Sequence, residues 1–497
     1  MAAAGKGLAA LLYAGSRTDP DAVAAWDDSQ TLSHRDLIRR VESTGLALDR
    51  MLERRRCRIG LCAGNRVDHL VAYLAILVAG YTWVPLNPRN GRALNAVLAE
   101  RAGLDLLLVG DDCDEDVPDW RPTVRLEELG GRQQGGNFEP AAPPRHDIAA
   151  IKFSGGSTGF PKGVMQTHGN MLAVIENMQS FYGFTGDDRN LALAPLTHGS
   201  SHYVVPVLAA GGSIQLMRPS SPGDILARLR GGTTIAFMPP TLIYRLLDTP
   251  GLEPDQFATL RHLTYGAAPM PPEKIAEAQR AFGPCISTVY GQVEAPMTIA
   301  ALGPEEMLDD RKKATVGRHC LTTAIRVVDD AGRPLPATET GNIEVSGPIV
   351  MQGYLDDDRM TAAVLRDGWL HTGDRGSLDD AGYLTLSGRA SDMIITGGFS
   401  VYPAEIENVL SELSGIRESC AFGVPDPYWG ERIEAVVIRD AASSVTEQGI
   451  LAFVRERLGP VRTPKTVHFA DDIPRNSVGK VVRKDMPGWI ESWHDEG

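Results

Sequence analysis

An alternation of helical and extended patterns along the first half of the chain most constrains its fold. Ser33 is a candidate N-cap for a helix that runs to about residue 52, a short apolar strand pattern follows at 59–62, and 69–79 has the composition of a buried helix. Strand patterns recur at 191–194, 214–217 and 234–237. Parallel strands need helical connections of this kind. We therefore predict an α/β fold whose parallel or mixed sheets are covered by helices on both faces.

The pattern changes from about residue 320 onward, where short strands alternate with turns rich in Gly or Pro. A turn at 388–392 then precedes a second series of alternating helices and strands. These changes predict a large N-terminal domain with a β-rich subdomain, hinged to a small α+β C-terminal domain. The predicted boundaries are 1–388 for the N-terminal domain, 320–388 for its β-rich subdomain, 389–392 for the hinge and 393–497 for the C-terminal domain.

Composition excludes several classes of protein. The chain has 497 residues and a formal net charge of -14, which argues against nucleic-acid binding. The strongest apolar run, 70–79, is far below the ~20 residues that span a bilayer, so we expect no integral membrane association. The apolar stretch 7–15 is too short for a typical signal peptide and favours an N-terminal helix. The six cysteines contain no CxxC pair, which favours a reduced, cytoplasmic setting. The sequence gives no indication of oligomeric state.

Residues 153–163 form the most informative segment, Phe-Ser-Gly-Gly-Ser-Thr-Gly-Phe-Pro-Lys-Gly. Glycines allow backbone N–H groups to turn toward an anion, while hydroxyl groups and the lysine ammonium add donors and positive charge. The segment therefore predicts a polyphosphate-binding loop. It contains neither GxxxxGK[ST] nor GxGxxG, which argues against a P-loop NTPase and a Rossmann dehydrogenase.

This loop resembles the signature of the AMP-forming adenylating enzymes, the superfamily of acyl-CoA synthetases, peptide-synthetase adenylation domains and beetle luciferases. Other segments resemble the remaining motifs of that family in the expected order, so the resemblance covers nearly the whole chain and is closest to acyl- or aryl-CoA ligases. These segments are Pro-Leu-Thr-His-Gly at 195–199, Tyr-Gly-Ala-Ala-Pro at 265–269, Tyr-Gly-Gln-Val-Glu at 290–294, His-Thr-Gly-Asp at 371–374, Ser-Gly-Arg at 387–389 and Pro-Arg-Asn-Ser-Val-Gly-Lys-Val-Val-Arg at 474–483.

The resemblance implies roles for the matching residues. Lys480 would bridge the substrate carboxylate and the α-phosphate of ATP, and Glu294, with Thr158, would hold Mg²⁺. His198 would border the acyl pocket, and Lys480, Glu294 and His198 are the three implied catalytic residues. The implied nucleotide-binding residues are Ser154, Gly155, Gly156, Ser157, Thr158, Gly159, Lys162, Gly266, Ala267, Ala268, Tyr290, Gly291, Asp374 and Arg389.

The resemblance also implies that the C-terminal domain moves. The domain would rotate about the hinge that contains Ser391, and Gly397 and Gly398 would then line the tunnel through which a pantetheine thiol reaches the adenylate. Glycine suits such a tunnel because no side chain blocks it. Many relatives carry Asp or Lys where this chain has Ser391, but rotation of the backbone there does not require a charge.

A second departure from the family pattern is Val293, which stands where Thr is usual. The loss of a hydroxyl that donates to a phosphate is worth about 1.5–3 kcal/mol. Neighbouring donors such as Thr158 offset part of this loss, so we expect activity to be retained.

The residues implied to line the acid pocket are neutral and mostly apolar, which favours an aryl or aliphatic acid. Relatives that activate amino acids carry an Asp shortly after the position of His198, whereas this chain reads His-Gly-Ser-Ser-His at 198–202. The implied pocket residues are His198, Phe237, Gly266, Val293 and Met297.

The main hypothesis is an ATP-dependent carboxylate–CoA ligase that uses ATP, Mg²⁺ and coenzyme A. Such an enzyme forms an acyl-adenylate and pyrophosphate, and then an acyl-CoA thioester and AMP. One alternative is an enzyme that stops at the adenylate or loads the pantetheine of a carrier protein. Another is a degenerate, non-catalytic nucleotide- or acyl-binding protein, which Val293 leaves open. Lys162 and Lys480, two of only nine lysines in the chain, favour a catalyst.

Overall fold

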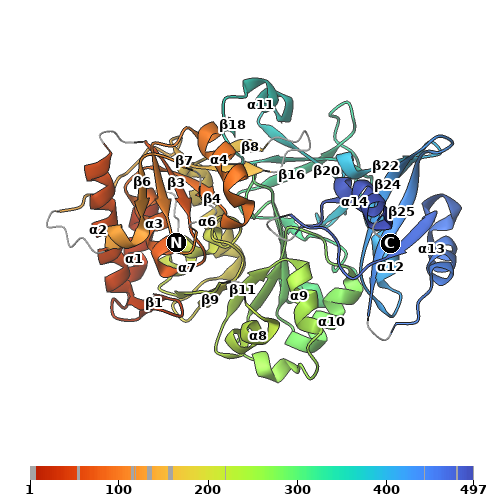
Figure 1. Cartoon of the computed structure of the whole chain (residues 1–497), viewed down its shortest axis with the longest axis horizontal. Coiled ribbons are helices and arrows are strands. Elements are labelled where there is room, and N and C mark those ends of the chain that lie inside the picture. The colour runs from red at the N-terminus through yellow and green to blue at the C-terminus, as the bar shows by residue number, and fades with distance from the viewer. Residues whose placement is uncertain are drawn as a thin grey trace.

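The computed structural model describes residues 7–52, 56–113, 117, 119–130, 137–154, 161–218, 220–440, 443–476 and 480–495. These residues form a large N-terminal α/β assembly, with a smaller α+β domain at its C-terminal side (Figure 1). The predicted fold class is confirmed. The predicted phosphate-loop residues Gly155, Gly156, Ser157, Thr158 and Gly159 lie outside the described residues.

One sheet of the N-terminal assembly has the order β18-β8-β7-β4-β3-β5-β6 over the described residues. Its pairs from β7 to β6 are parallel, whereas β7–β8 and β8–β18 are antiparallel. The mixed sheet therefore places the strand after the predicted phosphate loop beside the strand before it. The strands are β3 Arg58–Cys62, β4 Thr82–Leu86, β5 Leu106–Val109, β6 Thr123–Arg125, β7 Ile148–Ser154, β8 Lys162–Thr167 and β18 Gly353–Tyr354.

A second sheet has the order β15-β14-β13-β12-β11-β9-β10-β1-β2 within the described ranges. Its central pairs, from β13 to β1, are parallel, and its edges are antiparallel. The strands are β1 Val23–Trp26, β2 Thr31–Ser33, β9 Arg189–Ala192, β10 Ser213–Leu216, β11 Ile235–Met238, β12 His262–Tyr265, β13 Ile286–Tyr290, β14 Ala300–Leu302 and β15 Arg318–His319.

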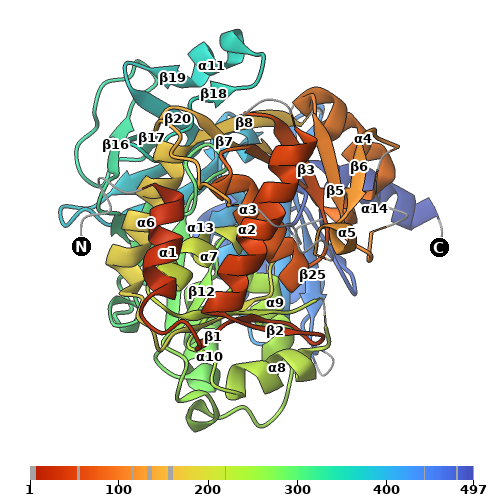
Figure 2. The ribbon, with the colours of Figure 1, turned by 90° about the vertical axis from the view of Figure 1, so that its left-hand side faces the viewer.

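Helices α3, α6 and α7 contribute to the largest apolar cluster together with strands of both sheets. Helix α3 is almost wholly buried, as its apolar composition predicts, and α1, α2 and α3 lie side by side (Figure 2). The predicted N-cap is confirmed, since the Ser33 Oγ accepts a 3.1 Å hydrogen bond from the Asp36 N–H. The helices are α1 Leu8–Ser16, α2 His34–Met51, α3 Val67–Val78, α4 Gly91–Ala102, α5 Leu126–Gly130, α6 His168–Tyr182, α7 Ser201–Ala209, α8 Pro222–Arg230, α9 Pro240–Leu247 and α10 Pro272–Phe282.

The β-rich part forms a third sheet, and the C-terminal domain a fourth. In the third sheet β16 Ala324–Val328, β17 Gly341–Ser346, β19 Leu365–Arg366, β20 Trp369–Leu378 and β21 Leu384–Arg389 are antiparallel, and α11 spans Asp358–Val364. The C-terminal elements are β22 Ile394–Thr396, β23 Phe399–Val401, α12 Pro403–Ser411, β24 Ile416–Asp426, β25 Gly430–Arg439, α13 Glu447–Arg462, β26 Thr466–Phe469 and α14 Met486–Asp495. The predicted hinge at 389–392 begins at the last residue of β21 and ends before β22. None of the helices in the described ranges combines the length and hydropathy that a membrane crossing requires.

Asn65 joins the two large sheets. This buried residue follows β3, and its Nδ2 donates to the carbonyl oxygens of Ala192, at 3.0 Å, and Ala194, at 2.9 Å. Its Oδ1 accepts from the Leu196 N–H at 2.9 Å. One amide therefore satisfies three backbone groups in the segment that leads from β9 toward His198.

We predict that Asn65→Ala lowers the apparent free energy of unfolding by about 1–3 kcal/mol, because buried backbone groups at 192–196 lose their partner. Urea denaturation measures this change. Asn342→Ala is the control, because the Asn342 amide donates to Asp330 at an exposed site, and we expect little change. Equal denaturation midpoints for the two variants would contradict the linking role of Asn65.

Candidate active site

The two ends of the predicted phosphate loop are adjacent. Ser154 ends β7, Lys162 begins β8, and the two residues are directly paired across the antiparallel ladder. The Lys162 ammonium lies 5.4 Å from the centre of the Tyr354 ring. The β7–β8 pair thus places a hydroxyl and an ammonium side by side at the two ends of the predicted loop.

Glu294 lies beside the base of this loop. Its Oε1 accepts from the Tyr354 hydroxyl at 3.0 Å and from the Ser154 hydroxyl at 3.4 Å. Burial and the neighbouring Glu294 carboxylate raise the pKa of Tyr354, so the phenol stays protonated and donates. The predicted magnesium residue therefore contacts Ser154, the first residue of the predicted phosphate-binding set. Tyr354 was not predicted from the sequence, because its place in this group depends on the pairing of β18 with β8.

A single carboxylate fits a magnesium ion that also binds substrate phosphates, which is a common arrangement for this metal. In the described part of the chain, no group of three or more His, Cys, Asp or Glu residues forms a metal site. Glu294 would thus hold Mg²⁺ together with the nucleotide. The other predicted metal residue, Thr158, lies outside the described residues.

A second set of predicted residues contacts Asp374. Its Oδ2 accepts from the Tyr290 hydroxyl at 2.5 Å and from the Gln292 Nε2 at 2.6 Å, and its Oδ1 lies 3.5 Å from the Arg389 Nε. Asp374 is only 8% exposed. Burial, and then the Asp374 charge, raise the pKa of Tyr290 well above its usual value. Gln292 is an addition to the predicted set, and its position inside the 290–294 motif was the available signal.

Close packing explains two of the predicted glycines. A Cβ on Gly266 would lie 3.0 Å from the Phe237 ring, and a Cβ on Gly291 would lie 2.3 Å from the backbone nitrogen of Met297. Met297 itself has a positive φ of 59°. Gly291 has no room for a side chain, and Gly266 would gain room for one only if the Phe237 ring shifted, so both keep the backbone close to its neighbours.

The predicted acid pocket is partly assembled around Phe237. Its ring packs closely against both Gly199 and Gly266. His198 directly precedes Gly199, so it lies next to this contact. Burial lowers the pKa of His198 to about 4, so its imidazole is neutral near pH 7. Val293 and Met297 pack against the main apolar cluster, and the carbonyl oxygen of Val293 accepts from Gln166 at 2.8 Å.

Lys480 lies in a cleft of about 150 Å³ between the large assembly and the C-terminal domain. The cleft is also lined by Ala267 and Ala268, the predicted nucleotide loop after β12. Burial lowers the pKa of Lys480, and the charge of Arg389 lowers it further. The cleft brings the Lys480 side chain, from one domain, to the predicted nucleotide residues of the other.

Side-chain contacts fix the segment that carries Lys480. The Lys480 N–H donates to the Asn476 Oδ1 at 2.9 Å. Arg483 donates to Glu407 of α12 at 2.5 Å and to Asp392 of the predicted hinge at 3.2 Å. The position of Lys480 is therefore set by ion pairs within its own domain and with the hinge.

The predicted thiol-tunnel residues lie elsewhere on the C-terminal domain. Gly397 and Gly398 form the turn between β22 and β23, and both have positive φ. A Cβ on Gly397 would lie 2.9 Å from the Trp429 ring. The surrounding side chains of Ile395, Phe399 and Tyr428 are exposed. In this structure the turn is at an exposed apolar surface, and Ser391 lies in the short helical turn before it.

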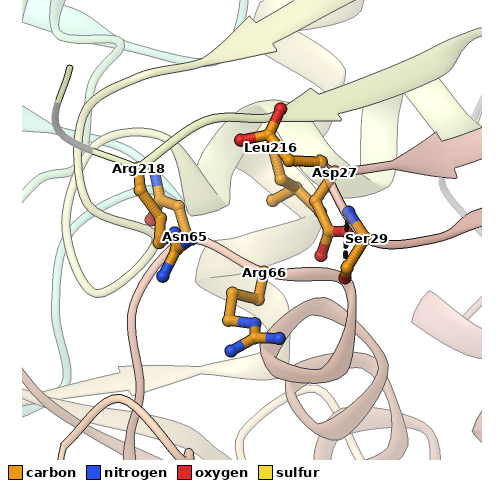
Figure 3. Close-up of a pocket in the computed structure, with 7 residues that line it drawn as sticks. Asp27, Ser29, Asn65, Arg66, Leu216 and Arg218 are labelled. Carbon is orange, nitrogen blue, oxygen red and sulfur yellow. Dashed lines mark hydrogen bonds between the residues drawn. The ribbon is translucent and has the colours of Figure 1, made fainter.

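A separate, small pocket lies at the Asn65 turn (Figure 3). Its volume of about 30 Å³ has room for little more than one water molecule. The Asp27 Oδ2 accepts from the Val67 N–H at 2.9 Å, and Arg66 is paired with Asp111. These polar groups are used within the protein, so we assign no ligand to this pocket.

Comparisons with known proteins agree with this geometry. The AMP-binding enzyme family matches residues 13–355, and the AMP-binding enzyme C-terminal domain matches residues 405–480. A feruloyl-CoA synthase of an Amycolatopsis species is 33% identical over 477 residues, which cover 95% of this chain and 96% of the relative.

Two solved structures extend the comparison to three dimensions. ATP-bound MatB from Rhodopseudomonas palustris has a TM-score of 0.86 and 28% identity, covering 96% of this chain and 98% of that one. The amide bond synthetase McbA from Marinactinospora thermotolerans has a TM-score of 0.87 and 27% identity, covering 97% and 99%. The chain belongs to the AMP-binding enzyme family.

Proposed function

We propose that the protein is an ATP-dependent carboxylate–CoA ligase that activates its acid as an acyl-adenylate. The observation that carries this proposal is the position of Lys480, which shares a cleft with the predicted nucleotide loop at Ala267 and Ala268. A nucleotide site alone would need no lysine from a second domain. The feruloyl-CoA synthase relative supports the assignment of CoA as the acceptor.

The chemical problem is that a carboxylate is a poor electrophile. Its attack on the α-phosphorus of ATP releases pyrophosphate and leaves a good leaving group on the acyl carbon. The protein must align the two anions and stabilise the charge that develops between them. A lysine ammonium suits this task, because it is a compact charge that two oxygens can share.

Each cluster of residues has a separate task in this proposal. Lys480 bridges the acid and the α-phosphate, while Ser154 and Lys162 contact the β- and γ-phosphates. Glu294 holds Mg²⁺, which when bound neutralises phosphate charge. The Asp374 carboxylate accepts from the ribose hydroxyls, and its contacts with Tyr290 and Arg389 hold it in place. Neutral His198 borders the acid without pairing with it, so the carboxylate remains free to attack.

The acid is proposed to be an aryl or aliphatic carboxylic acid. Phe237 provides an apolar wall, and the packing of its ring against Gly199 and Gly266 limits the width of the pocket there. The relative named feruloyl-CoA synthase acts, by its name, with an aryl acid.

Thioester formation is proposed to need a second arrangement of the domains. The turn at Gly397 and Gly398 is surrounded by exposed apolar side chains, including Phe399 at 58% and Tyr428 at 83%. An exposed apolar surface of this kind commonly marks a docking site. Rotation about the hinge at Ser391 would withdraw Lys480 and place this surface over the adenylate.

The structural similarity to the amide bond synthetase McbA supports one alternative. In this alternative the enzyme forms the adenylate and passes the acyl group to an acceptor other than CoA. Incubation with ATP, Mg²⁺ and a panel of acids separates the possibilities. Pyrophosphate and a CoA thioester support the ligase. Pyrophosphate without a CoA thioester supports the alternative acceptor, and no pyrophosphate with any acid supports a non-catalytic protein.

We also propose a cytoplasmic location. Among the described residues, Cys62, Cys113, Cys285, Cys320 and Cys420 are buried thiols that form no disulfide. A reducing compartment preserves such thiols.

We predict that Lys480→Ala reduces adenylate formation at least about a hundredfold, because the charge between the two reacting anions is lost. Thiol attack on supplied acyl-adenylate should fall less than about threefold, since Lys480 is withdrawn in that step. Pyrophosphate release and thioester formation measure the two half-reactions. Lys484→Ala is the matched control, because Lys484 is an exposed lysine four residues away. Equal loss in both half-reactions would contradict the two-arrangement account.

We predict that Phe399→Gln slows thioester formation about tenfold and leaves adenylate formation within about twofold, because only the second step buries this apolar ring. The substitution introduces no charge that would repel CoA. Leu308→Gln is the control, since Leu308 is an exposed apolar residue of the large assembly. A comparable loss of pyrophosphate release in Phe399→Gln would show that the surface does not act in the second step alone.

A further inference from the structure

Lys152 is a buried lysine in the large N-terminal assembly. It lies in β7 and is 7% exposed. Its Nζ lies 3.1 Å from the His202 Nε2, 3.4 Å from the Ser201 Oγ and 5.1 Å from the centre of the Trp83 ring. No carboxylate pairs with it among the residues that the structure describes. Buried charges in proteins are normally paired, so an unpaired ammonium in such a place needs an explanation.

Strand geometry places Lys152 on the reactive side of β7. Residues two apart in a strand point to the same face, so Lys152 shares a face with Ser154, which contacts Glu294. The two positions are about 7 Å apart along the strand. Lys152 is more buried than Ser154 and lies on the same face of β7.

The contacts of Lys152 belong to the turn that borders the proposed acid pocket. Ser201 and His202 begin α7, and the Ser201 hydroxyl donates to the carbonyl oxygen of His198 at 2.8 Å. His198 and His202 retain partial solvent exposure, although burial lowers the pKa of both. Both imidazoles are therefore partly accessible to solvent while most of their surroundings are protein.

The environment of Lys152 suits an anion. Both histidines are neutral, so they act as hydrogen-bonding groups and add no competing positive charge. The indole N–H of Trp83 is a second buried donor next to Lys152, and the described residues give it no acceptor. The first residues of α7 add the positive end of a helix dipole. Burial lowers the pKa of Lys152 to about 7, which a bound anion would reverse.

We propose that Lys152 binds a second anionic oxygen at the distal end of the acid, and that this site selects carboxylic acids which carry a further carboxylate or a phenolate. The inference rests on the proposed adenylating function and deepens it. Lys152 is a specificity-determining residue in this account. It acts on recognition of the acid and takes no part in the transfer of the acyl group.

The test uses paired acids that differ only in the distal oxygen. Straight-chain diacids of four to eight carbons are compared with their monomethyl esters, and 4-hydroxyaryl acids with their 4-methoxy analogues. In at least one pair, the wild-type kcat/KM for pyrophosphate release should be about tenfold or more higher for the free acid, whose distal carboxyl or hydroxyl group is unmethylated, than for its capped, methylated analogue. The two series distinguish a carboxylate from a phenolate as the preferred group.

Lys152→Met removes the charge and keeps the length of the side chain. It should lower kcat/KM about tenfold to a hundredfold for the preferred acid, mainly through KM, and change the capped analogue less than about threefold. Lys152→Gln retains a hydrogen-bond donor, so its kcat/KM for the preferred acid should lie between those of the wild-type protein and Lys152→Met. Lys313→Met is the matched control, because Lys313 is a buried lysine outside the site, paired with Asp310 at 2.7 Å.

Calorimetric binding of the same acid pairs, in the presence of an α,β-methylene ATP analogue, gives a readout that needs no turnover. Lys152→Met should weaken binding of the free acid about tenfold and leave the capped acid unchanged. The inference is overturned if Lys152→Met weakens binding of the free and the capped acid equally. It is also overturned if the wild-type protein prefers the capped acid in every pair. If no acid releases pyrophosphate but the binding difference persists, the proposed function fails and the anion site stands.

Discussion

The arrangement of the predicted nucleotide site depends on the contacts of one buried carboxylate, that of Asp374. Its partners come from separate parts of the fold, because Tyr290 ends β13 of a large sheet and Arg389 ends the last strand before the hinge. Arg389 in turn influences the charge of Lys480 across the cleft. A carboxylate in this position lowers the cost of placing two cationic side chains near each other before any phosphate is present.

The sequence predicted those parts of the fold that depend on local pattern. The alternation of helices and strands and the Ser33 cap were confirmed because hydrophobic period and cap chemistry act over a few residues. The group around Glu294 was only partly predicted. Tyr354 contacts Glu294 across 60 positions of sequence, and no local pattern contains that pairing. A function for Lys152 was not predicted, for a similar reason. Its proposed role depends on the absence of a carboxylate among its described neighbours from β4 and α7, which lie far from it in the sequence.

The departure at Val293 also has a structural context. The backbone carbonyl of Val293 is held by Gln166 of β8, the strand that follows the phosphate loop, and Glu294 is held on its other side by Met351. The backbone of this motif is thus fixed by groups that do not depend on the side chain at 293. A Val in place of Thr removes one donor but leaves the orientation of Glu294 to these neighbours.

The double contact of Arg483 links the segment of Lys480 to the predicted hinge. One guanidinium group holds α12 through Glu407 and the hinge through Asp392, and it lies three residues beyond Lys480. In the proposed rotation about Ser391, Asp392 and Arg483 would lie on the same side of the pivot, so their contact would move with the domain. Arg483 would then keep the segment of Lys480, helix α12 and Asp392 together as one unit, so that departure of the lysine and rotation of the domain would be a single motion rather than two successive ones.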